Sequence, residues 1–232
     1  MRIVVVGDGK MGHAVAGLAE RRGHSILAMI GGEENASGRA LTRERLAGAD
    51  VAIEFTQPDA AAANLERLIE AGLPTVTGTT GWLAELPRIT ALVQRNGGSF
   101  LYASNFSVGV QLFLRAAGEL ASRFANHAEF DAFILEEHHA GKRDAPSGTA
   151  RSLAEALRRG DPTRSYPITS IRAGAIPGTH AVTYDGPSES VTLRHEARSR
   201  DGFAAGALAA AEWLPGHPGV HTFEEMLFGA TK

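Results

Sequence analysis

The stretch R-I-V-V-V-G-D-G-K-M-G, residues 2–12, decides the fold. Its first five residues, an arginine and four apolar residues, are typical of a buried strand, and the alanine-rich sequence that follows, through Arg22, has helical periodicity. Between them, three glycines match the pattern G-x-G-x-x-G in the strand-turn-helix context that it requires. Glycines at this spacing permit a tight turn, close approach of the backbone to a pyrophosphate, and packing of helix on strand. The stretch therefore predicts dinucleotide binding by Gly7, Asp8, Gly9, Lys10, Met11 and Gly12.

An acidic residue stands where the adenosine ribose of a dinucleotide is usually recognised. A second strand is predicted over Ser25–Ile30, and Glu33 follows 21 residues after Gly12. A carboxylate there favours NADH over NADPH, because no arginine stands directly beside it and the nearest one downstream is Arg39. Two glycines precede the acid, so the sequence leaves open whether Glu33 or Glu34 points inward.

Strand and helix patterns alternate over the rest of the first hundred residues. We expect strands at 51–55, 74–77 and 99–103, with helices at 60–71 and 83–94. This rhythm predicts a parallel sheet with right-handed crossovers, which is a Rossmann-like, doubly wound α/β fold. In such folds ligands bind at the carboxyl ends of the strands. Three loops fall there: Phe55 and Thr56; Gly78, Thr79 and Thr80; and Ser104, Asn105 and Phe106.

The second half of the chain has a different pattern. A helix predicted from Val108 to about Phe124 places a domain boundary near Asn105 or Phe106. Three runs rich in threonine, valine and isoleucine follow, separated by glycine or proline, and we expect them to form antiparallel strands. They span residues 168–172, 179–184 and 190–195.

The chain is expected to return to the first domain near Ser199, through an alanine-rich helix at 203–213 and a short terminal element at 223–228. We therefore predict a discontinuous dinucleotide-binding domain and an α+β domain for substrate binding and oligomerisation. An open sheet in the second domain has a face to cover, which favours self-association. The predicted domains comprise residues 1–105 with 200–232, and residues 106–199.

The run E-E-H-H-A-G-K-R-D-A-P-S-G-T-A, residues 136–150, gathers the groups best suited to chemistry. It follows an apolar run at 130–135, so we expect it to be the loop between a buried strand and a helix. The imidazole of His138 or His139 can exchange a proton at neutral pH, and Lys142 can pair with a carboxylate or supply a proton. These groups suit an acidic, reducible substrate.

The end of this run predicts a site for anions. Pro146 biases the preceding residue away from helical geometry, so the helix should begin just after it with Ser147 as its N-cap. The amides of Gly148 and Thr149 would then point outward. Free amides at a helix N-terminus bind carboxylates.

The same run resembles the signature of the 4-hydroxy-tetrahydrodipicolinate reductases, formerly dihydrodipicolinate reductases, of the bacterial diaminopimelate and lysine pathway. This resemblance implies that His138 is the catalytic proton donor or acceptor and Lys142 the second acid, a ranking that spacing alone does not give. It also implies that the substrate carboxylates are held by His139, Lys142, Ser147, Gly148 and Thr149, with Arg200 in a segment near the substrate.

The loop motifs F-T-x-P, G-T-T-G and N-F-S-V-G, in this order, are similar to the other cofactor-side motifs of that family. They imply that the nicotinamide half is lined by Phe55, Thr56, Gly78, Thr79, Thr80, Ser104, Asn105 and Phe106. The resemblance further implies NADH or NADPH as cofactor, a small dicarboxylate as substrate, and a homotetramer built through the second sheet. Two other functions stay open: a different small-acid dehydrogenase, of the aspartate or homoserine type, and a non-catalytic NAD-sensing module.

Composition excludes several other classes. The chain has 232 residues, a net charge of −3 and no cysteine. Without a basic excess, neither nucleic acid nor an anionic membrane is an expected partner. Without cysteine there is no disulfide, thiolate nucleophile or cysteine-ligated metal, and no apolar run approaches the roughly 18 residues of a membrane span. We expect a cytoplasmic enzyme with no metal, whose nine histidines occur singly outside the pair at 138–139.

Overall fold

The computed structural model describes residues 1–229 and divides into two compact units. Unit 1 comprises Met1–Ser107 together with the chain from Arg200 onward, and unit 2 comprises Val108–Ser199. Each unit has its own buried apolar clusters. None of the helices within residues 1–229 combines the length and the apolar character needed to span a bilayer.

Unit 1 is built on a six-stranded sheet in which every neighbouring pair is parallel. The strand order is β10-β5-β4-β3-β1-β2, so the chain passes from β1 to β2 on one side and then to β3 on the other. This reversal is the switch point at which doubly wound folds bind ligands, and the predicted fold class is confirmed. The strands are β1 (Arg2–Val6), β2 (Ser25–Ile30), β3 (Val51–Glu54), β4 (Thr75–Thr77), β5 (Ser99–Tyr102) and β10 (Gly219–Thr222).

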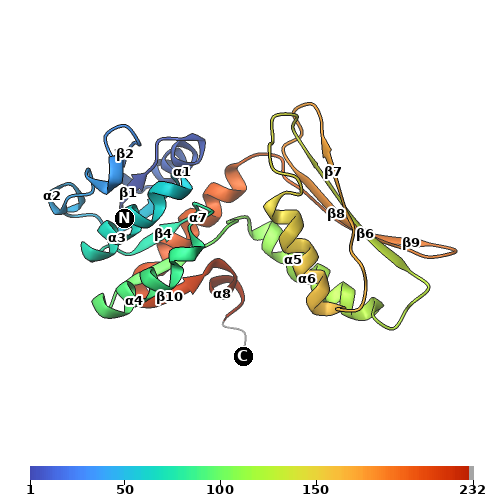
Figure 1. Ribbon diagram of the computed structural model, residues 1–232. Coiled ribbons are helices and arrows are strands. Elements are labelled where there is room, and N and C mark those ends of the chain that lie inside the picture. The colour runs from blue at the N-terminus through green and yellow to red at the C-terminus, as the bar shows by residue number, and fades with distance from the viewer. Residues whose placement is uncertain (230–232) are drawn as a thin grey trace. The chain divides into compact units, whose positions relative to one another are not determined.

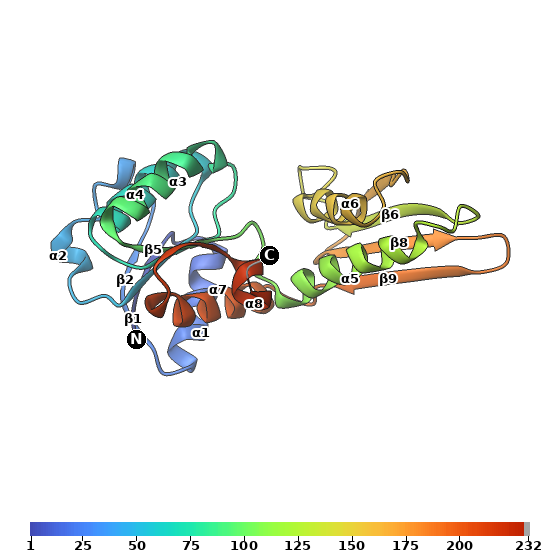
Figure 2. The same cartoon turned by 90° about the horizontal axis from the view of Figure 1, so that it is seen from below.

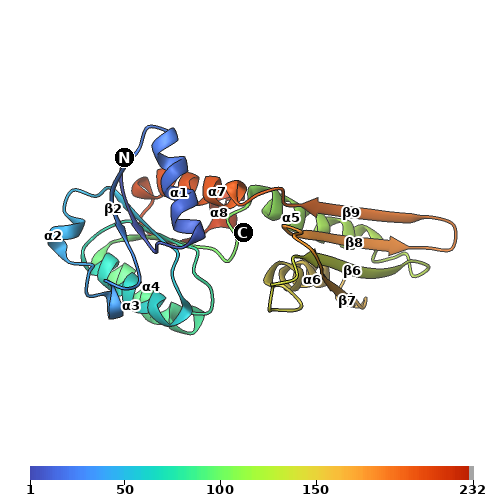
Figure 3. The ribbon, with the colours of Figure 1, turned by 90° about the horizontal axis from the view of Figure 1, so that it is seen from above.

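Helices cover both faces of this sheet (Figures 2 and 3). One face carries α1 (Lys10–Arg21), α7 (Asp201–Trp213) and α8 (Phe223–Phe228), and the other carries α3 (Pro58–Glu70) and α4 (Leu86–Asn96). Each long helix presents an apolar stripe to the sheet; in α1 the stripe is Gly12, Val15, Ala16 and Ala19. Short turns complete the unit: η1 (Ala36–Gly38), α2 (Arg43–Leu46), η2 (Leu83–Glu85) and η3 (Leu214–Gly216).

Unit 2 is a four-stranded sheet in the order β7-β6-β8-β9, with two helices packed together on one face (Figure 1). Within residues 108–199, no helix covers the other face. Phe113 of α5, Leu153 of α6 and Tyr184 of β8 are among the side chains that fill the core between helices and sheet. The elements are α5 (Val108–Phe124), β6 (Asp131–His138), α6 (Gly148–Gly160), β7 (Ile168–Arg172), β8 (Thr179–Asp185) and β9 (Ser190–Glu196).

Two expectations for unit 2 were wrong. The strand β7 pairs parallel to β6, not antiparallel, because the connection between them runs through α6 and forms a crossover. The second concerns the length of β6, which continues through Glu136 and Glu137 to His138, so these residues lie in a strand rather than in the following loop. The alternation of side chains along β6 therefore places Glu136 and His138 together on the buried face.

The close packing of α7 generates a stability prediction. A methyl group at Gly206 would lie 1.8 Å from the carbonyl oxygen of Phe106, whereas at Gly202, in the same helix, the nearest atom is 4.0 Å away. We expect Gly206→Ala to lower the free energy of unfolding by about 1–3 kcal/mol or more, because backbone must move. Gly202→Ala is the control and should be neutral or stabilising by up to about 1 kcal/mol. Thermal unfolding of both variants measures this difference. Equal melting temperatures for Gly206→Ala and Gly202→Ala would contradict the close packing of Gly206 against Phe106.

Candidate functional site

The glycine loop after β1 has the geometry that a dinucleotide requires. Gly7 has a positive φ of 109°, and a side chain there would lie 2.0 Å from the carbonyl oxygen of Phe55. A side chain at Gly12 would lie 1.9 Å from the carbonyl of Gly7, so helix α1 can approach β1 only without one. At Gly9 nothing lies within 4 Å. The loop is therefore tight at its first and third glycines and open at the second, where a pyrophosphate would meet the N-terminus of α1.

The loops after β3 and β4 interlock at the same edge of the sheet. A side chain at Gly78 would lie 2.0 Å from the ring of Phe55, so the glycine lets this ring pass beneath the loop. The backbone amide of Thr56 donates to the hydroxyl of Thr79 at 2.8 Å. Thr80 is exposed. The structure thus brings the predicted residues of these two loops together, as parallel strands require.

A buried acid that the sequence reasoning missed lies beneath these loops. Glu54, the last residue of β3, has no exposed surface, and its carboxylate accepts from the hydroxyls of Thr56, Thr77 and Thr79. Burial raises the pKa of Glu54 above its usual range, although these hydrogen bonds oppose the shift. Asn64 extends the network by donating to Thr56 at 3.2 Å. The sequence signal that could have identified Glu54 is its position at the end of an apolar strand, with a threonine two residues later.

The third predicted loop, after β5, can offer its backbone to a ligand but not the ring of Phe106, which is buried. Phe106 is buried and packs against Phe55, with ring centroids 6.1 Å apart, and against Phe223 at 5.0 Å. Asn105 accepts from the backbone amide of Ser107 at 2.8 Å, while Ser104 is exposed. The Phe106 side chain therefore belongs to the core of unit 1.

The loop after β2 holds two acids in different environments. Glu34 pairs with Arg45 at 2.8 Å, and the hydrogen bond from Arg45 lowers the pKa of Glu34. Arg39 donates to the backbone carbonyls of Glu34 and Glu33, at 3.1 and 3.4 Å. Arg45 thus engages Glu34, whereas the carboxylate of Glu33 forms no ion pair within residues 1–229. The nearby carboxylate of Asp8 lies over Gly31, where an added Cβ would be 2.4 Å from it.

In unit 2 the structure builds a cluster around His138. Its Nδ1 lies 2.5 Å from Oε2 of Glu136, a carboxylate with no exposed surface. The other oxygen of Glu136 accepts from Arg172 at 2.6 Å and from the backbone amide of Ser147 at 3.3 Å. Burial by itself would raise the pKa of Glu136, but hydrogen bonds from Arg172 and Ser170 dominate and lower it to about 2.

Histidines that stand singly in the sequence are brought together with this pair by the register of the second sheet. His180 is paired in register with Glu136 on one side and with His195 on the other. Its ring lies 5.1 Å from that of His138, and its Nε2 lies 3.1 Å from the hydroxyl of Ser147. Burial, together with the neighbouring His138, lowers the pKa of His180 to about 4.

The N-terminus of α6 forms as predicted. Ser147 is the N-cap, and its hydroxyl accepts from the backbone amide of Ala150 at 3.2 Å. Gly148 is exposed, with nothing within 4 Å of an added side chain, so space for a ligand exists at the first turn. Thr149 is half-buried. A helix start of this kind favours a carboxylate.

The loop from β6 to α6 carries the other predicted groups. Lys142 pairs with Asp144 at 2.7 Å, and the carbonyl of Asp144 accepts from Arg172 at 2.6 Å. His139 is half-buried. Unit 2 thus assembles every predicted substrate residue except Arg200, which belongs to unit 1 as the N-cap of α7.

One atom from each of Glu136, His138 and His180 lies within 4.8 Å of the others, a spacing that could suit a metal ion. The guanidinium of Arg172, however, already pairs with the same carboxylate, and a second cation would be repelled by it. We therefore interpret this cluster as an ion-pair network.

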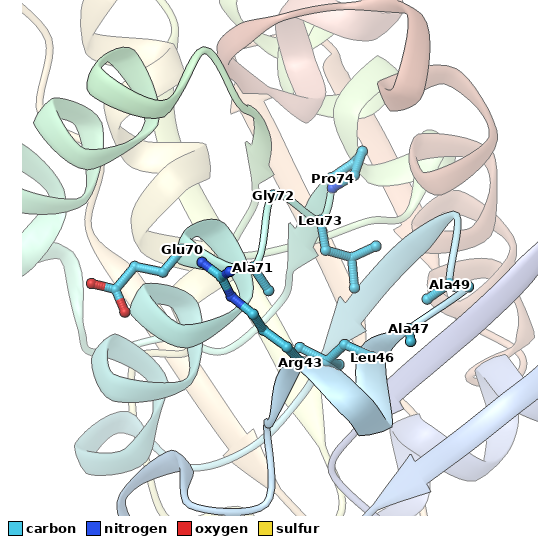
Figure 4. Close-up of a pocket in the computed structure, with 10 residues that line it drawn as sticks. Arg43, Leu46, Ala47, Ala49, Glu70, Ala71, Gly72, Leu73 and Pro74 are labelled. Atoms are coloured by element: carbon cyan, nitrogen blue, oxygen red, sulfur yellow. The ribbon is translucent and has the colours of Figure 1, made fainter.

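A cavity of about 440 Å³ opens elsewhere in unit 1 (Figure 4). Its walls include Ala49, two residues before β3, and Pro74, directly before β4, with Arg43 and Glu70 on its sides. These are the amino ends of the strands, opposite the glycine loop. The cavity is therefore separate from the predicted dinucleotide site.

Comparisons with known proteins cover both units. The family model described as dihydrodipicolinate reductase, N-terminus, matches residues 1–106, and the one described as dihydrodipicolinate reductase, C-terminus, matches residues 109–227. A 4-hydroxy-tetrahydrodipicolinate reductase of Christiangramia forsetii is 33% identical over 98% of each chain. One from Myxococcus xanthus is 36% identical, over 91% of this chain and 82% of its own.

Solved structures support the same fold. The dipicolinate-bound dihydrodipicolinate reductase from Paenisporosarcina sp. TG-14 has a TM-score of 0.81 and 22% identity, covering 97% of this chain and 99% of its own. Aspartate semialdehyde dehydrogenase II from Vibrio cholerae has a TM-score of 0.56 and 10% identity, covering 91% of this chain and 97% of its own. At these identities the likeness concerns the fold alone.

The buried histidines predict a dependence of stability on pH. Because the pKa of His180 is about 4 in the folded chain and near 6.5 when unfolded, its neutral form stabilises the fold above pH 6.5. This contribution is lost as pH falls from 6.5 towards 4, and the loss amounts to roughly 2 kcal/mol at pH 5.

We expect His180→Gln to lose less free energy of unfolding between pH 7.5 and 5 than the parent chain. His127→Gln, at an exposed histidine, should retain the parent slope. Denaturant unfolding at the two pH values measures this, and identical slopes for the parent and His180→Gln would refute the assignment.

Proposed function

The chain belongs to the dihydrodipicolinate reductase family, and we propose that it performs the reaction for which its relatives are named. It is an oxidoreductase that reduces 4-hydroxy-tetrahydrodipicolinate to tetrahydrodipicolinate with NADH or NADPH, a step of diaminopimelate and lysine biosynthesis. The observation that carries the proposal is the cluster in unit 2, where a buried acid contacts His138 beside the open start of α6. A non-catalytic NAD-sensing module would have no need of such a cluster.

We assign the dinucleotide to unit 1. The tight and open glycines of the loop after β1 leave room for a pyrophosphate, and Glu33 would accept from the adenosine ribose. When bound, the nicotinamide supplies the hydride. The backbone of the loops after β3, β4 and β5 would line its ring, and the Glu54 network keeps the first two of these loops in place.

Unit 2 would hold the diacid and supply the proton. Lys142, His139 and the amides of Gly148 and Thr149 would bind the carboxylates, because cations and helix N-termini both attract anions. His138 would donate the proton that accompanies the hydride, and loss of water completes the net reaction. Arg200, from unit 1, is a further proposed contact to the substrate.

We propose NADH as the preferred cofactor. The carboxylate of Glu33 favours a ribose hydroxyl and repels a 2′-phosphate, whereas Arg39 is engaged by the backbone carbonyls of its own loop. We further propose a cytoplasmic location, since a chain without cysteine suits a reducing compartment.

A coupled assay tests the function. The condensation product of pyruvate and aspartate semialdehyde is supplied, and oxidation of NADH and NADPH is followed side by side. We expect turnover with both cofactors and a higher kcat/KM with NADH. Activity on aspartate semialdehyde or homoserine, but not on the cyclic diacid, would instead identify a different small-acid dehydrogenase.

We expect His138→Gln to lower kcat by roughly 10²- to 10⁴-fold, which is the usual contribution of a general acid. Dinucleotide affinity, measured by quenching of protein fluorescence, should be unchanged, because His138 lies in unit 2. His127→Gln is the matched control and should keep parent activity. Near-normal turnover of His138→Gln would rule out its role as the proton donor.

We propose that the uncovered face of the second sheet forms a homotetramer. Phe133 and Ile171 are 42% and 39% exposed, and the registers place both on this face, on the adjacent strands β6 and β7. An apolar sheet face of this kind is commonly covered by another copy of the chain. Phe133→Glu should shift the mass measured by light scattering towards smaller species. Leu83→Glu, at a more exposed leucine of unit 1, should leave the mass unchanged; if both variants stay tetrameric, this face is not the interface.

A further inference from the structure

We propose that Glu136 is the positioning residue of His138: it holds Nδ1 of the imidazole and directs Nε2 towards the substrate. The inference deepens the proposed function, since it concerns the residue assigned there as proton donor. Neither the sequence motif nor the family comparison assigns a role to Glu136.

The geometry of β6 supports this role. Residues two apart in a strand share a face, so Glu136 and His138 must both lie on the buried face of the second sheet. The carboxylate cannot turn away to solvent, because it has no exposed surface. Its orientation is fixed from the other side by Arg172 at 2.6 Å and the amide of Ser147 at 3.3 Å. One oxygen therefore serves these donors, and the other is left for His138, 2.5 Å away.

A glycine lies beside Nε2, the other ring nitrogen of His138. Gly178 has a positive φ of 146°, and a Cβ there would lie 3.1 Å from Nε2 of His138. A side chain at that position would crowd the nitrogen that Glu136 does not contact. The two ring nitrogens thus have different surroundings: Nδ1 meets a fixed carboxylate, whereas Nε2 faces Gly178, a residue with no side chain to occupy the space beside it. This arrangement resembles other sites in which a carboxylate fixes the tautomer and orientation of a histidine.

The charges around His138 make Glu136 important for its protonation as well. Burial lowers the pKa of His138, Lys142 and Arg172 lower it further, and the charge of Glu136 opposes these effects. The other charged or titratable groups of this cluster are His180 of β8, which borders His195 of β9, and Asp144, which pairs with Lys142. Glu136 is the buried anion among them. Its removal would leave the imidazole near Arg172 and Lys142 without a buried anion to offset their charge, which disfavours the protonated form.

The neighbouring residue provides a matched control. Glu137 has the same side chain and lies one position along β6, so it points to the opposite face of the sheet. Glu136→Gln and Glu137→Gln therefore make the same chemical change on opposite faces. Glu136→Asp keeps the charge on the buried face while altering the reach of the carboxylate.

The first test is nuclear magnetic resonance of the full chain with ¹⁵N-labelled histidine, without substrate. We expect neutral His138 in the parent to carry its proton on Nδ1, and we expect Glu136→Gln to lower the pKa of His138 by one unit or more. Glu137→Gln should leave both properties unchanged. A proton on Nε2 in the neutral parent would overturn the proposal even if Glu136→Gln failed to fold.

The second test is the pH dependence of kcat. If turnover needs protonated His138, kcat falls as pH rises through the pKa of His138. In Glu136→Gln this decrease in kcat should begin at lower pH than in the parent, and kcat at neutral pH should be at least tenfold lower. In Glu136→Asp the decrease in kcat should occur at the same pH as in the parent. Dinucleotide affinity should not change in any variant. An unshifted profile in Glu136→Gln would reject the positioning role. Because the spectroscopic test needs no turnover, it separates failure of this inference from failure of the proposed reaction.

Discussion

The burial of carboxylates is the constraint on which both units depend. An ion removed from water loses several kcal/mol of solvation, which only close partners can offset. Glu136 in unit 2 is surrounded by a guanidinium, an imidazole and a backbone amide, and Glu54 in unit 1 by three threonine hydroxyls. Because the partners come from separate loops and strands, satisfying each acid also fixes those segments relative to one another.

The two acids suit different kinds of chemistry. Glu54 is surrounded by neutral hydroxyls, so it holds loops in place without supplying a strong field. Glu136 contacts Arg172 and His138, so it balances charge where a proton would move. Unit 1 thus offers a rigid edge of backbone suited to a dinucleotide, whereas unit 2 offers a charged interior suited to a diacid and its proton donor.

Regular elements were predicted well because their patterns are local. The first two strands, the helix over 108–124 and the Ser147 cap follow directly from apolar periodicity and capping preference. The strand β10 was not predicted, since its four residues G-V-H-T carry no recognisable period and gain their partners only from β5. The end of β6 was misplaced because two glutamates and a histidine are typical of a loop, and only pairing with β7 and β8 places them in a strand.

The sequence by itself determined the family and the parallel α/β unit, and it supplied the residues proposed to bind a dinucleotide or a diacid, because glycine spacing, periodicity and signature motifs are properties of adjacent residues. Tertiary structure alone decided that β7 runs parallel to β6, that His180 joins His138, and that Glu136 contacts Nδ1. Each of these facts depends on strands distant in the chain being brought into register, or on burial removing the water that would otherwise surround a charge. Neither effect is encoded at a single position.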